Sequence, residues 1–324
     1  MRAVWMREFG PPEVLVAGEA PDPSAGPDQV VVRVAAIGIP FVETQVRAGH
    51  SPRVGAEPRP PIIPGNGVGG TVIAVGDDVD PELIGRRFVT STGGSGGYAE
   101  QVAVAAAGLI PVPDELDMLD AVALLADGRT ALALARAAHI GAGDRVLVPA
   151  AGGGVGTLLI QLARNAGAGT IVAAAGSEEK RALARELGAD QAIDYRQPDW
   201  TDQARRANGD AGFDVVFDGV GGTIGRAAFE LTAPGGRYVI FGLSSGSLTE
   251  ASLADIMFRG IIAIGGPQIR SAAQLRDLSA DALRESAAGR LRPVIGQTFP
   301  LDQAAGAHAA IEHRTTIGKT LLIP

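Results

Sequence analysis

Short apolar runs alternate with amphipathic segments from residue 144 to about residue 264, and this alternation constrains the fold more than any other feature of the sequence. In one segment, the apolar residues Val155, Leu158, Leu159 and Leu162 recur at the helical spacing i, i+3, i+4 and i+7. The predicted strands are residues 145–149, 170–174, 191–195, 213–217 and 237–241, and the predicted helices are residues 154–165 and 178–187. Strands that alternate with helices form βαβ units, so we predict an α/β fold with a doubly wound parallel sheet.

The sequence on either side of this region follows other patterns. Residues 1 to about 120 hold short β-branched runs separated by glycine and proline, which predict a small barrel or irregular sheet. Residues 119–138 are rich in alanine and leucine and predict a helix interrupted at Asp127-Gly128. The tail does not continue the alternation, so we expect it to rejoin the N-terminal region. The tail elements are a helix at 272–288, a strand at 293–298, a helix at 301–313 and a closing apolar run at 319–323. The predicted domains are residues 121–264, and residues 1–120 together with 265–324.

The composition excludes several classes of protein. The 324 residues include no cysteine, which rules out disulfides, iron–sulfur clusters and cysteine-ligated zinc. The four histidines lack HxxxH or HxH spacing, so we predict no metal site. The net charge is −8 without a basic block, so nucleic acid is not an expected partner. We find no run of about 18 apolar residues and no secretory signal, so we expect a cytoplasmic protein that does not span a membrane.

The most informative motif is the turn after the first strand of the alternating region. Ala150, Gly153 and Gly156 have the spacing A-x-x-G-x-x-G, a variant of the turn that opens a helix in dinucleotide-binding domains. A helix N-terminus offers unpaired N–H groups, and glycines let a pyrophosphate approach the backbone. We therefore predict that Gly153, Gly154, Val155 and Gly156 bind a pyrophosphate. The alternative is a turn that only permits close packing of helix on strand.

The end of the second strand indicates which dinucleotide is bound. An NAD site usually has Asp or Glu here, about 20 residues after the glycine turn, to bind the ribose 2′-hydroxyl. This strand ends at Gly176 and Ser177 without an acid, and Lys180 follows within one turn. A lysine can donate to a 2′-phosphate as a point charge, so we predict NADPH as the cofactor. The alternative is that Lys180 is an exposed residue of a helix whose N-cap is Ser177.

Further motifs recur along the whole chain. They are Ala35-Ala36-Ile37-Gly38-Ile39, Pro64-Gly65, Gly97-Tyr98-Ala99-Glu100, Gly128-Arg129-Thr130-Ala131, the turn at 150–156, Gly176-Ser177-Glu178-Glu179-Lys180, Leu187-Gly188-Ala189-Asp190, Ile193-Asp194-Tyr195, Gly235-Gly236-Arg237, Phe241-Gly242 and Gly318-Lys319. With these motifs the chain resembles the zinc-free quinone oxidoreductase (zeta-crystallin-like) branch of the medium-chain dehydrogenase/reductase superfamily. The resemblance implies a Rossmann domain inserted into a GroES-like β-rich domain, with the cofactor in the cleft between them.

The resemblance also implies which residues contact NADPH. Lys180 and Tyr195 would meet the 2′-phosphate, and Thr130 would lie near the nicotinamide. The cofactor-binding residues expected in this way are Pro40, Thr130, Gly153, Gly154, Val155, Gly156, Gly176, Ser177, Lys180, Tyr195, Val220, Phe241, Gly242, Ser244 and Lys319. A homodimer is the expected assembly.

Two departures from family patterns bear on the chemistry. The zinc-dependent branch carries Gly-His-Glu, whereas this chain has Gly65, Asn66 and Gly67, so the resemblance implies no catalytic zinc. The quinone reductase branch carries the pattern Asn-Phe-x-Asp-x-Tyr. In this chain Pro40 takes the place of the Asn and Gln45 takes the place of the Tyr, so the resemblance does not define the substrate preference. Gln45, Tyr98 and Thr130 are candidates for orienting a substrate carbonyl. We assign no general acid, and we expect the histidines at the surface or in packing.

These features together predict an NADPH-dependent, zinc-independent reductase that transfers hydride to quinones or α,β-unsaturated carbonyl compounds. Such acceptors delocalise the charge they receive, so they need no strong Lewis acid, and the protein supplies position and exclusion of water. One alternative is an enoyl or enone (alkene) reductase. Another is a protein that binds NADPH without turnover, as a sensor or a structural protein.

Overall fold

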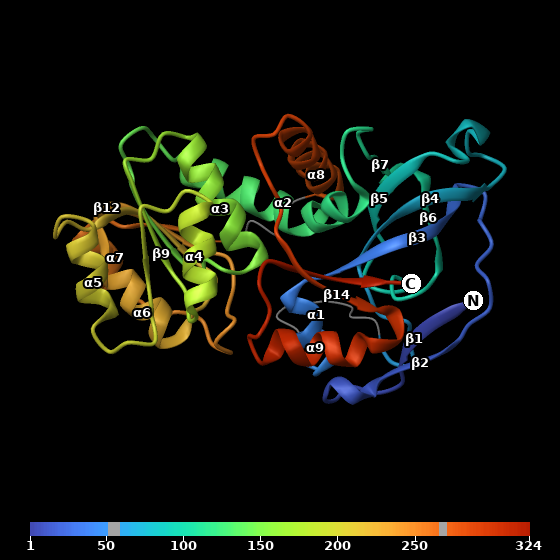
Figure 1. The fold of residues 1–324 in the computed structure, drawn as a ribbon, viewed down its shortest axis with the longest axis horizontal. Helices are drawn as coiled ribbons and strands as arrows, with labels where there is room; N and C mark the ends of the chain where they lie inside the picture. The colour runs from blue at the N-terminus through green and yellow to red at the C-terminus, as the bar shows by residue number, and fades with distance from the viewer. Residues whose placement is uncertain (51–58, 266–270) are drawn as a thin grey trace. The chain divides into compact units, whose positions relative to one another are not determined.

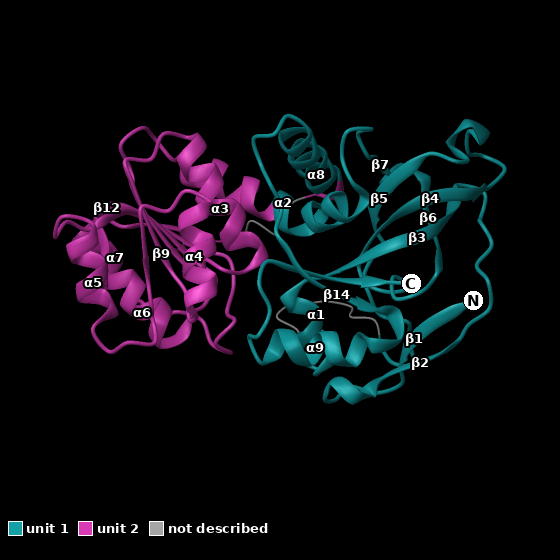
Figure 2. Cartoon of the chain, viewed as in Figure 1, with its two compact units in different colours: residues 1–129, 273–324 teal, residues 130–272 magenta. Residues whose placement is uncertain are grey.

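The structure is a computed structural model that describes residues 1–50, 59–265 and 271–324 (Figure 1). The chain forms two compact units (Figure 2): unit 1 comprises residues 1–129 and 273–324, and unit 2 comprises residues 130–272. The domain limits expected from the sequence, after residues 120 and 264, stay a prediction. Residues 266–270 of the expected tail lie outside the described residues.

Unit 2 contains a six-stranded sheet with the order β10-β9-β8-β11-β12-β13, in which every pair of neighbours is parallel. The order reverses between β8 and β11, and ligands of doubly wound sheets bind beyond the carboxyl ends of the strands at such a switch point. The strands are β8 (Arg145–Pro149), β9 (Thr170–Ala174), β10 (Gln191–Ile193), β11 (Phe213–Asp218), β12 (Thr232–Ile240) and β13 (Ile262–Ile264).

Helices connect these strands and pack on the sheet. The periodic residues Leu158 and Leu159 of α3 are buried, as the helical spacing predicted, and the core continues through Leu147, Val172 and Phe229. The helices are α3 (Gly154–Asn165), α4 (Glu178–Glu186), α5 (Trp200–Ala207), α6 (Gly222–Glu230) and α7 (Leu253–Arg259). The predicted doubly wound parallel sheet is confirmed.

Unit 1 is built on a second, mostly antiparallel sheet. Its order is β14-β15-β3-β4-β5-β7, β6 also pairs with β3, and β1 and β2 form a separate antiparallel pair. The strands are β1 (Arg2–Met6), β2 (Leu15–Glu19), β3 (Gln29–Ile39), β4 (Gly67–Val75), β5 (Arg87–Ser91), β6 (Gln101–Ala105), β7 (Ile110–Pro111), β14 (Ile295–Pro300) and β15 (Lys319–Ile323). Because β15 pairs with β3, the tail does rejoin the N-terminal region.

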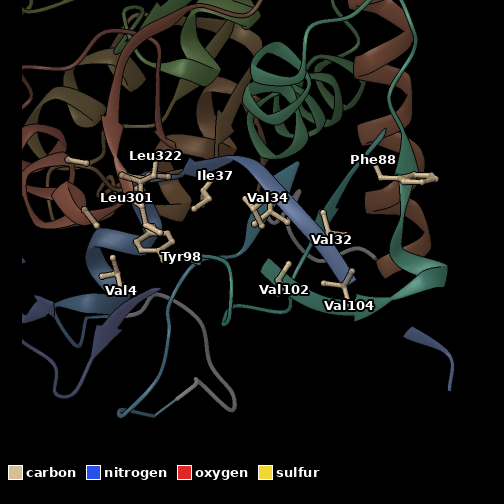
Figure 3. Packing of buried hydrophobic residues seen from close by; sticks show 14 of the residues in the cluster. Val4, Val32, Val34, Ile37, Phe88, Tyr98, Val102, Val104, Leu301 and Leu322 are labelled. Atoms are coloured by element: carbon tan, nitrogen blue, oxygen red, sulfur yellow. The ribbon is translucent and has the colours of Figure 1, made fainter. Parts of the chain in front are cut away.

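The core of unit 1 joins residues far apart in the sequence (Figure 3). Val32 and Ile37 of β3 pack with Val104 of β6, and Leu301 and Leu322 of the tail belong to the same buried cluster. The helices are α1 (Phe41–Arg47), α8 (Ala272–Ala287), α9 (Ala304–Glu312) and α2 (Met118–Ala138), which continues into unit 2. Short 3-10 turns are η1 (Pro12–Val14), η2 (Pro81–Leu83), η3 (Ala106–Gly108) and η4 (Leu301–Gln303).

The predicted interruption of the helix at Asp127-Gly128 is wrong, because α2 is continuous. Gly128 costs helix propensity, but it permits close packing within unit 1. A Cβ added at Gly128 would lie 2.8 Å from the Cβ of Ala282 in α8. The glycine therefore marks a helix contact and not a helix end.

Other boundaries differ by a few residues. β10 ends at Ile193 instead of residue 195, so Tyr195 follows the strand. β12 begins at Thr232, before a register shift in its pairing with β11, instead of at residue 237. The expected helix at 301–313 is divided into η4 and α9. Each difference lies at an end of a strand or helix, where apolar spacing carries little information.

Candidate functional site

The turn between β8 and α3 is shaped by contacts that only small residues allow. Ala150 has a left-handed φ of 53°, and its carbonyl accepts a hydrogen bond from the amide of Gly153 at 3.1 Å. A Cβ added at Gly156 would lie 2.5 Å from the carbonyl oxygen of Ala150. The close approach of α3 to the end of β8 therefore requires glycine at position 156, which supports the packing role that the sequence left as an alternative.

The same turn presents backbone amides. The amide of Thr157 donates to the carbonyl of Gly153 at 2.9 Å and is the first to follow the helical pattern. The amides of Gly154, Val155 and Gly156 precede it, so they project from the N-terminal end of α3, where the helix dipole favours anions. Gly153 is exposed, and Gly154 and Val155 are half-buried. The turn thus has the chemistry that a diphosphate needs, so packing and phosphate binding are compatible roles.

Lys180 lies beside this turn. Its side chain packs over Gly152, where an added Cβ would lie 2.6 Å from Cγ of Lys180. Ser177 is the N-cap of α4, and its Oγ accepts a hydrogen bond from the Lys180 amide at 3.3 Å. The N-cap that the sequence offered as an alternative is therefore present, and it holds the backbone of Lys180 while the side chain borders the glycine turn.

Tyr195 borders the end of the neighbouring strand. A Cβ added at Gly176 would lie 3.4 Å from the hydroxyl of Tyr195. Lys180 thus lies against the glycine turn and the phenol of Tyr195 lies beside Gly176, both in unit 2. The roles of Gly176, Ser177, Lys180 and Tyr195 toward a cofactor stay predictions.

A charged cluster beside Tyr195 was missed by the sequence reasoning. Arg196 donates to Asp194 at 2.7 and 2.9 Å, and Arg181 lies 2.9 Å from the same carboxylate. These hydrogen bonds, those of Arg196 first, hold the pKa of Asp194 well below its usual range. The charge of Asp194 is therefore neutralised by two guanidinium groups and does not oppose a phosphate. The run Asp194-Tyr195-Arg196 was a visible signal, but the spacing does not show which arginine turns toward the acid.

The residues expected to line the cofactor path lie after β11 and β12. The ring of Phe241 packs over Gly219, where an added Cβ would lie 2.6 Å from Cζ. The amide of Ser244 donates to the Gly219 carbonyl at 3.2 Å, and Val220 accepts from Ser245 at 2.8 Å. Val220, Phe241, Gly242 and Ser244 are therefore brought together at the carboxyl ends of β11 and β12, as a doubly wound site requires.

Asp218, which the sequence reasoning did not single out, holds these two loops. Its buried carboxylate accepts from the amides of Val220 and Gly221, each at 2.9 Å, and from the hydroxyls of Tyr238 at 2.7 Å and Thr249. Burial, and then the charge of Asp218, raise the pKa of Tyr238 well above its usual range. Tyr238 is thus a neutral donor. An acid directly after an apolar strand was the available signal for this network.

Unit 1 contains a small pocket with about 270 Å³ of open space. Its lining includes Pro40 and Lys319, two of the expected cofactor residues. Lys319 is buried, and its Nζ lies 3.0 Å from Oδ1 of Asp127, so the charge of Lys319 is balanced. The described lining residues are Gly38, Pro40, Asn66, Gly67, Ser91, Val122, Leu125, Ala126, Arg129 and Lys319.

The three candidates for a substrate carbonyl do not line this pocket. Gln45 is half-buried on α1, where its amide donates to Oγ1 of Thr44 at 3.3 Å, and Thr130 is half-buried on α2. Tyr98 is fully buried within the core of unit 1 (Figure 3). A substrate cannot reach a phenol enclosed in this way, so the structure contradicts the proposed contact of Tyr98 with substrate.

Tyr98 instead belongs to a buried polar network. Its hydroxyl lies 2.7 Å from Oε2 of Glu43 and 2.8 Å from Nε2 of His308, and Oε1 of Glu43 accepts from the amide of Asn66 at 2.8 Å. Its ring fills the space beside Gly65, where an added Cβ would lie 2.4 Å from Cδ1. Burial, and then the charge of Glu43, raise the pKa of Tyr98. The network therefore fixes the backbone of Asn66, a pocket residue.

The network also assigns the proton of His308. If the Tyr98 hydroxyl donates to the Glu43 carboxylate, Nε2 of His308 must carry the hydrogen that it shares with Tyr98. Nδ1 is then an acceptor, and it is buried without a hydrogen-bond partner among the described residues. Burial, together with the positive charge of Arg47, lowers the pKa of His308 to about 3. His308 is thus a neutral packing histidine, as expected.

Two absences apply to the part of the chain that the structure describes. None of its helices is long and apolar enough to cross a membrane. Within the same residues, no three His, Asp or Glu side chains gather as a metal site would require.

Comparison with known proteins identifies the class. The profile of the alcohol dehydrogenase GroES-like domain matches residues 26–114, and that of the zinc-binding dehydrogenases matches residues 154–278. A β-rich unit interrupted by a Rossmann-type unit, with these two matches, defines a medium-chain dehydrogenase/reductase.

Relatives that match this chain along its full length identify its branch within the class. The chain is 34% identical over 327 residues to human quinone oxidoreductase, covering 100% of this chain and 98% of the relative. It is 33% identical over 332 residues to a 2-haloacrylate reductase of a Burkholderia species, covering 99% and 98%. The structure of Escherichia coli quinone oxidoreductase complexed with NADPH matches with a TM-score of 0.90 at 29% identity, covering 100% of both chains. The chain belongs to the quinone oxidoreductase branch of the medium-chain dehydrogenases/reductases and is an oxidoreductase.

Proposed function

We propose that this chain is an NADPH-dependent, zinc-independent reductase of quinones or α,β-unsaturated carbonyl compounds. The main support is the contact between Lys180 and Gly152 at one end of the unit 2 sheet. This contact lies beside the glycine turn whose backbone amides project from the N-terminus of α3. The strand end at Gly176 has no acid to bind a ribose 2′-hydroxyl, and Asp194 nearby is neutralised by arginine. Three neighbours in structure, including the Escherichia coli protein, were solved with NADPH, which supports the same cofactor here.

Each group of residues has a proposed part in binding. The amides of Gly154, Val155 and Gly156 would hold the diphosphate, because they project from the positive end of α3. Lys180 and Tyr195 would hold the 2′-phosphate, as a cation and a hydroxyl donor. Val220, Phe241, Gly242 and Ser244 would line the path of the cofactor, in loops that Asp218 holds in place. Bound NADPH supplies the hydride.

The acceptor is proposed to be a conjugated system. The relatives are named for quinones and for 2-haloacrylate, and both acceptor types delocalise the electron pair that they accept. The pocket of unit 1 offers apolar walls from Val122 and Leu125 and polar groups from Asn66 and Ser91. Thr130 and Gln45 stay candidates for orienting the acceptor.

A single assay tests this proposal. Purified protein is mixed with NADPH and with a panel of quinones and enones, and the loss of absorbance at 340 nm is followed. Turnover of quinones supports the proposed reaction, and turnover restricted to enones supports the enone reductase alternative. Saturable NADPH binding without consumption by any acceptor would support a non-catalytic binding protein, and the absence of saturable binding would overturn the cofactor assignment.

We also propose that the protein is a cytoplasmic homodimer. β13 lies at the edge of the unit 2 sheet, and among the described strands it pairs only with β12. Ile262 of β13 is 55% exposed, and Leu253, Met257 and Phe258 of α7 are 69–84% exposed. An unpaired strand edge beside an exposed apolar helix is a surface that a second copy could cover.

A further inference from the structure

Arg196 follows Tyr195 directly, and its side chain passes the same strand end. A Cβ added at Gly176 would lie 3.5 Å from Cδ of Arg196 and 3.4 Å from the hydroxyl of Tyr195. The hydrogen bond with Asp194 raises the pKa of Arg196, and electrostatic interaction with Tyr195 acts in the same direction. Arg196 therefore borders the proposed site of the 2′-phosphate, although the sequence analysis did not select it.

Asp194 fixes the orientation of this guanidinium. Its Oδ1 accepts from Nε of Arg196 at 2.9 Å and from the Arg196 amide at 3.0 Å, and its Oδ2 accepts from Nη2 at 2.7 Å. These contacts use Nε and Nη2 and leave Nη1 without a partner among the residues that the structure describes. Because its fork is already held, Arg196 would lose little conformational freedom when it binds a phosphate.

Arg181 and Arg196 share the carboxylate of Asp194, so this acid balances the charge of each arginine only in part. The two arginines differ in their surroundings. The side chain of Arg181 is 14% exposed and also lies 2.9 Å from Glu178. The side chain of Arg196 is 61% exposed and has no second acid among the described residues. Arg196 is therefore the arginine of this cluster that a nucleotide can reach.

We propose that Arg196 binds the 2′-phosphate of NADPH together with Lys180 and Tyr195, and that Asp194 is the positioning residue that orients its guanidinium. This inference rests on the proposed function and adds to it a second cation that selects NADPH over NADH. An acid that binds the ribose 2′-hydroxyl selects NADH. Asp194 has the opposite effect, because it directs an arginine toward the phosphate.

The test compares ligands with and without the 2′-phosphate. Fluorescence titration measures Kd for NADPH and NADH, and calorimetry measures Kd for adenosine 2′,5′-bisphosphate and adenosine 5′-monophosphate. Arg196→Gln should raise Kd for NADPH and for the bisphosphate by roughly 3- to 10-fold, a modest factor because water screens an exposed charge. The same variant should leave Kd for NADH and for the monophosphate nearly unchanged.

Arg206→Gln is the matched control. Arg206 is also an arginine of unit 2, its side chain is 64% exposed, and it lies 3.9 Å from Asp199. This variant should change none of the four Kd values.

Asp194→Asn separates the orientation of Arg196 from the charge of the site. The substitution removes a negative charge near the phosphate, so charge alone predicts tighter binding of NADPH. We expect weaker binding of NADPH instead, because a side-chain amide cannot accept hydrogen bonds from Nε and Nη2 together. Binding of NADH should change little.

An unchanged ratio of the two nucleotide Kd values in Arg196→Gln, or an equal loss for both nucleotides, would overturn the inference. The proposed function would stand if Lys180→Ala still weakened NADPH binding selectively. Tighter binding of NADPH by Asp194→Asn would overturn the positioning role of Asp194. If the natural protein bound neither nucleotide saturably, the proposed cofactor would be wrong, and the inference with it.

Discussion

The side chain of Lys180 lies so close to Gly152 that a Cβ at position 152 would be 2.6 Å from Cγ of the lysine. Position 152 therefore controls where a cation of α4 can lie, although Gly152 follows β8 and Lys180 belongs to the helix after β9. A glycine of the turn after β8 thus makes room for the side chain of Lys180.

Lys180→Ala should weaken NADPH binding and leave NADH binding nearly unchanged, because only NADPH carries the 2′-phosphate. The loss of one charge-assisted hydrogen bond corresponds to about a 10- to 150-fold increase in Kd. Fluorescence titration with both nucleotides measures this difference. Arg185→Ala, on the same helix and paired with Glu178, is the control and should change neither Kd. An equal loss for NADPH and NADH in Lys180→Ala would remove the lysine from the phosphate site.

Gly152→Ala should also weaken NADPH binding more than NADH binding, because the added methyl group must displace Lys180. The variant should fold, since the contact is with a flexible side chain. Gly306→Ala in α9 is the matched control, because an added Cβ there meets nothing within 4 Å. The measurements are the two nucleotide Kd values and the Tm of each variant. An NADPH-to-NADH ratio equal to that of the natural protein would show that the close contact is unimportant for binding.

Asp218→Asn should lower the free energy of unfolding by about 2–4 kcal/mol, because a buried acceptor of four hydrogen bonds gains an amide that faces donors. Urea denaturation measures the change. Asp202→Asn, at a carboxylate that is 61% exposed, should change stability little. Equal stability of the two variants would mean that Asp218 does not hold the loops after β11 and β12.

The buried network of unit 1 predicts a dependence of stability on pH. The pKa of His308 falls from 6.5 to about 3 in the folded protein, so between these values the unfolded chain binds a proton that the folded chain does not. The free energy of unfolding should therefore decrease on acidification through this range, by up to about 1.4 kcal/mol per pH unit from His308 alone. Urea denaturation of the natural protein and of His308→Gln at pH 7 and pH 5 measures this term. A stability difference between the two proteins that is the same at both pH values would contradict it.

Phe258→Glu should convert the proposed dimer into a monomer, because it places a charge on the exposed apolar surface beside β13. Light scattering after size-exclusion chromatography measures the mass. Ile84→Glu is the control, since Ile84 is an exposed apolar residue of unit 1, 51% exposed, and it should leave the mass unchanged. A natural protein that elutes as a monomer would end the dimer proposal.

Most of the unit 2 fold could be predicted, because its sequence repeats a buried apolar strand followed by an amphipathic helix. The strands at 145–149 and 170–174 and the helix at 154–165 have the predicted bounds, since each is a buried apolar run or an amphipathic period between turn residues. The continuity of α2 through Gly128 could not be predicted. Whether a glycine ends a helix or admits a neighbour depends on Ala282, more than 150 residues further along the chain.

The candidate site was predictable where it is made by local backbone and less so where it is made by side chains. The turn at 153–156 is local, and its amides lie as expected. Tyr98 lies in a motif that marks the family, but the motif does not show that its hydroxyl turns inward to Glu43 and His308. Asp218 holds its loops through partners that are distant in sequence, such as Tyr238 and Thr249.

The pairing of β15 with β3 sets an order of events during synthesis. Residues 29–39 leave the ribosome early, but their neighbour in the sheet, residues 319–323, is made almost three hundred residues later. Residues 130–272, which form unit 2, are synthesised in between and can fold first. During this time the sheet of unit 1 lacks the strand that pairs with β3. Nascent chains of this protein therefore depend on the last strand to close their first domain.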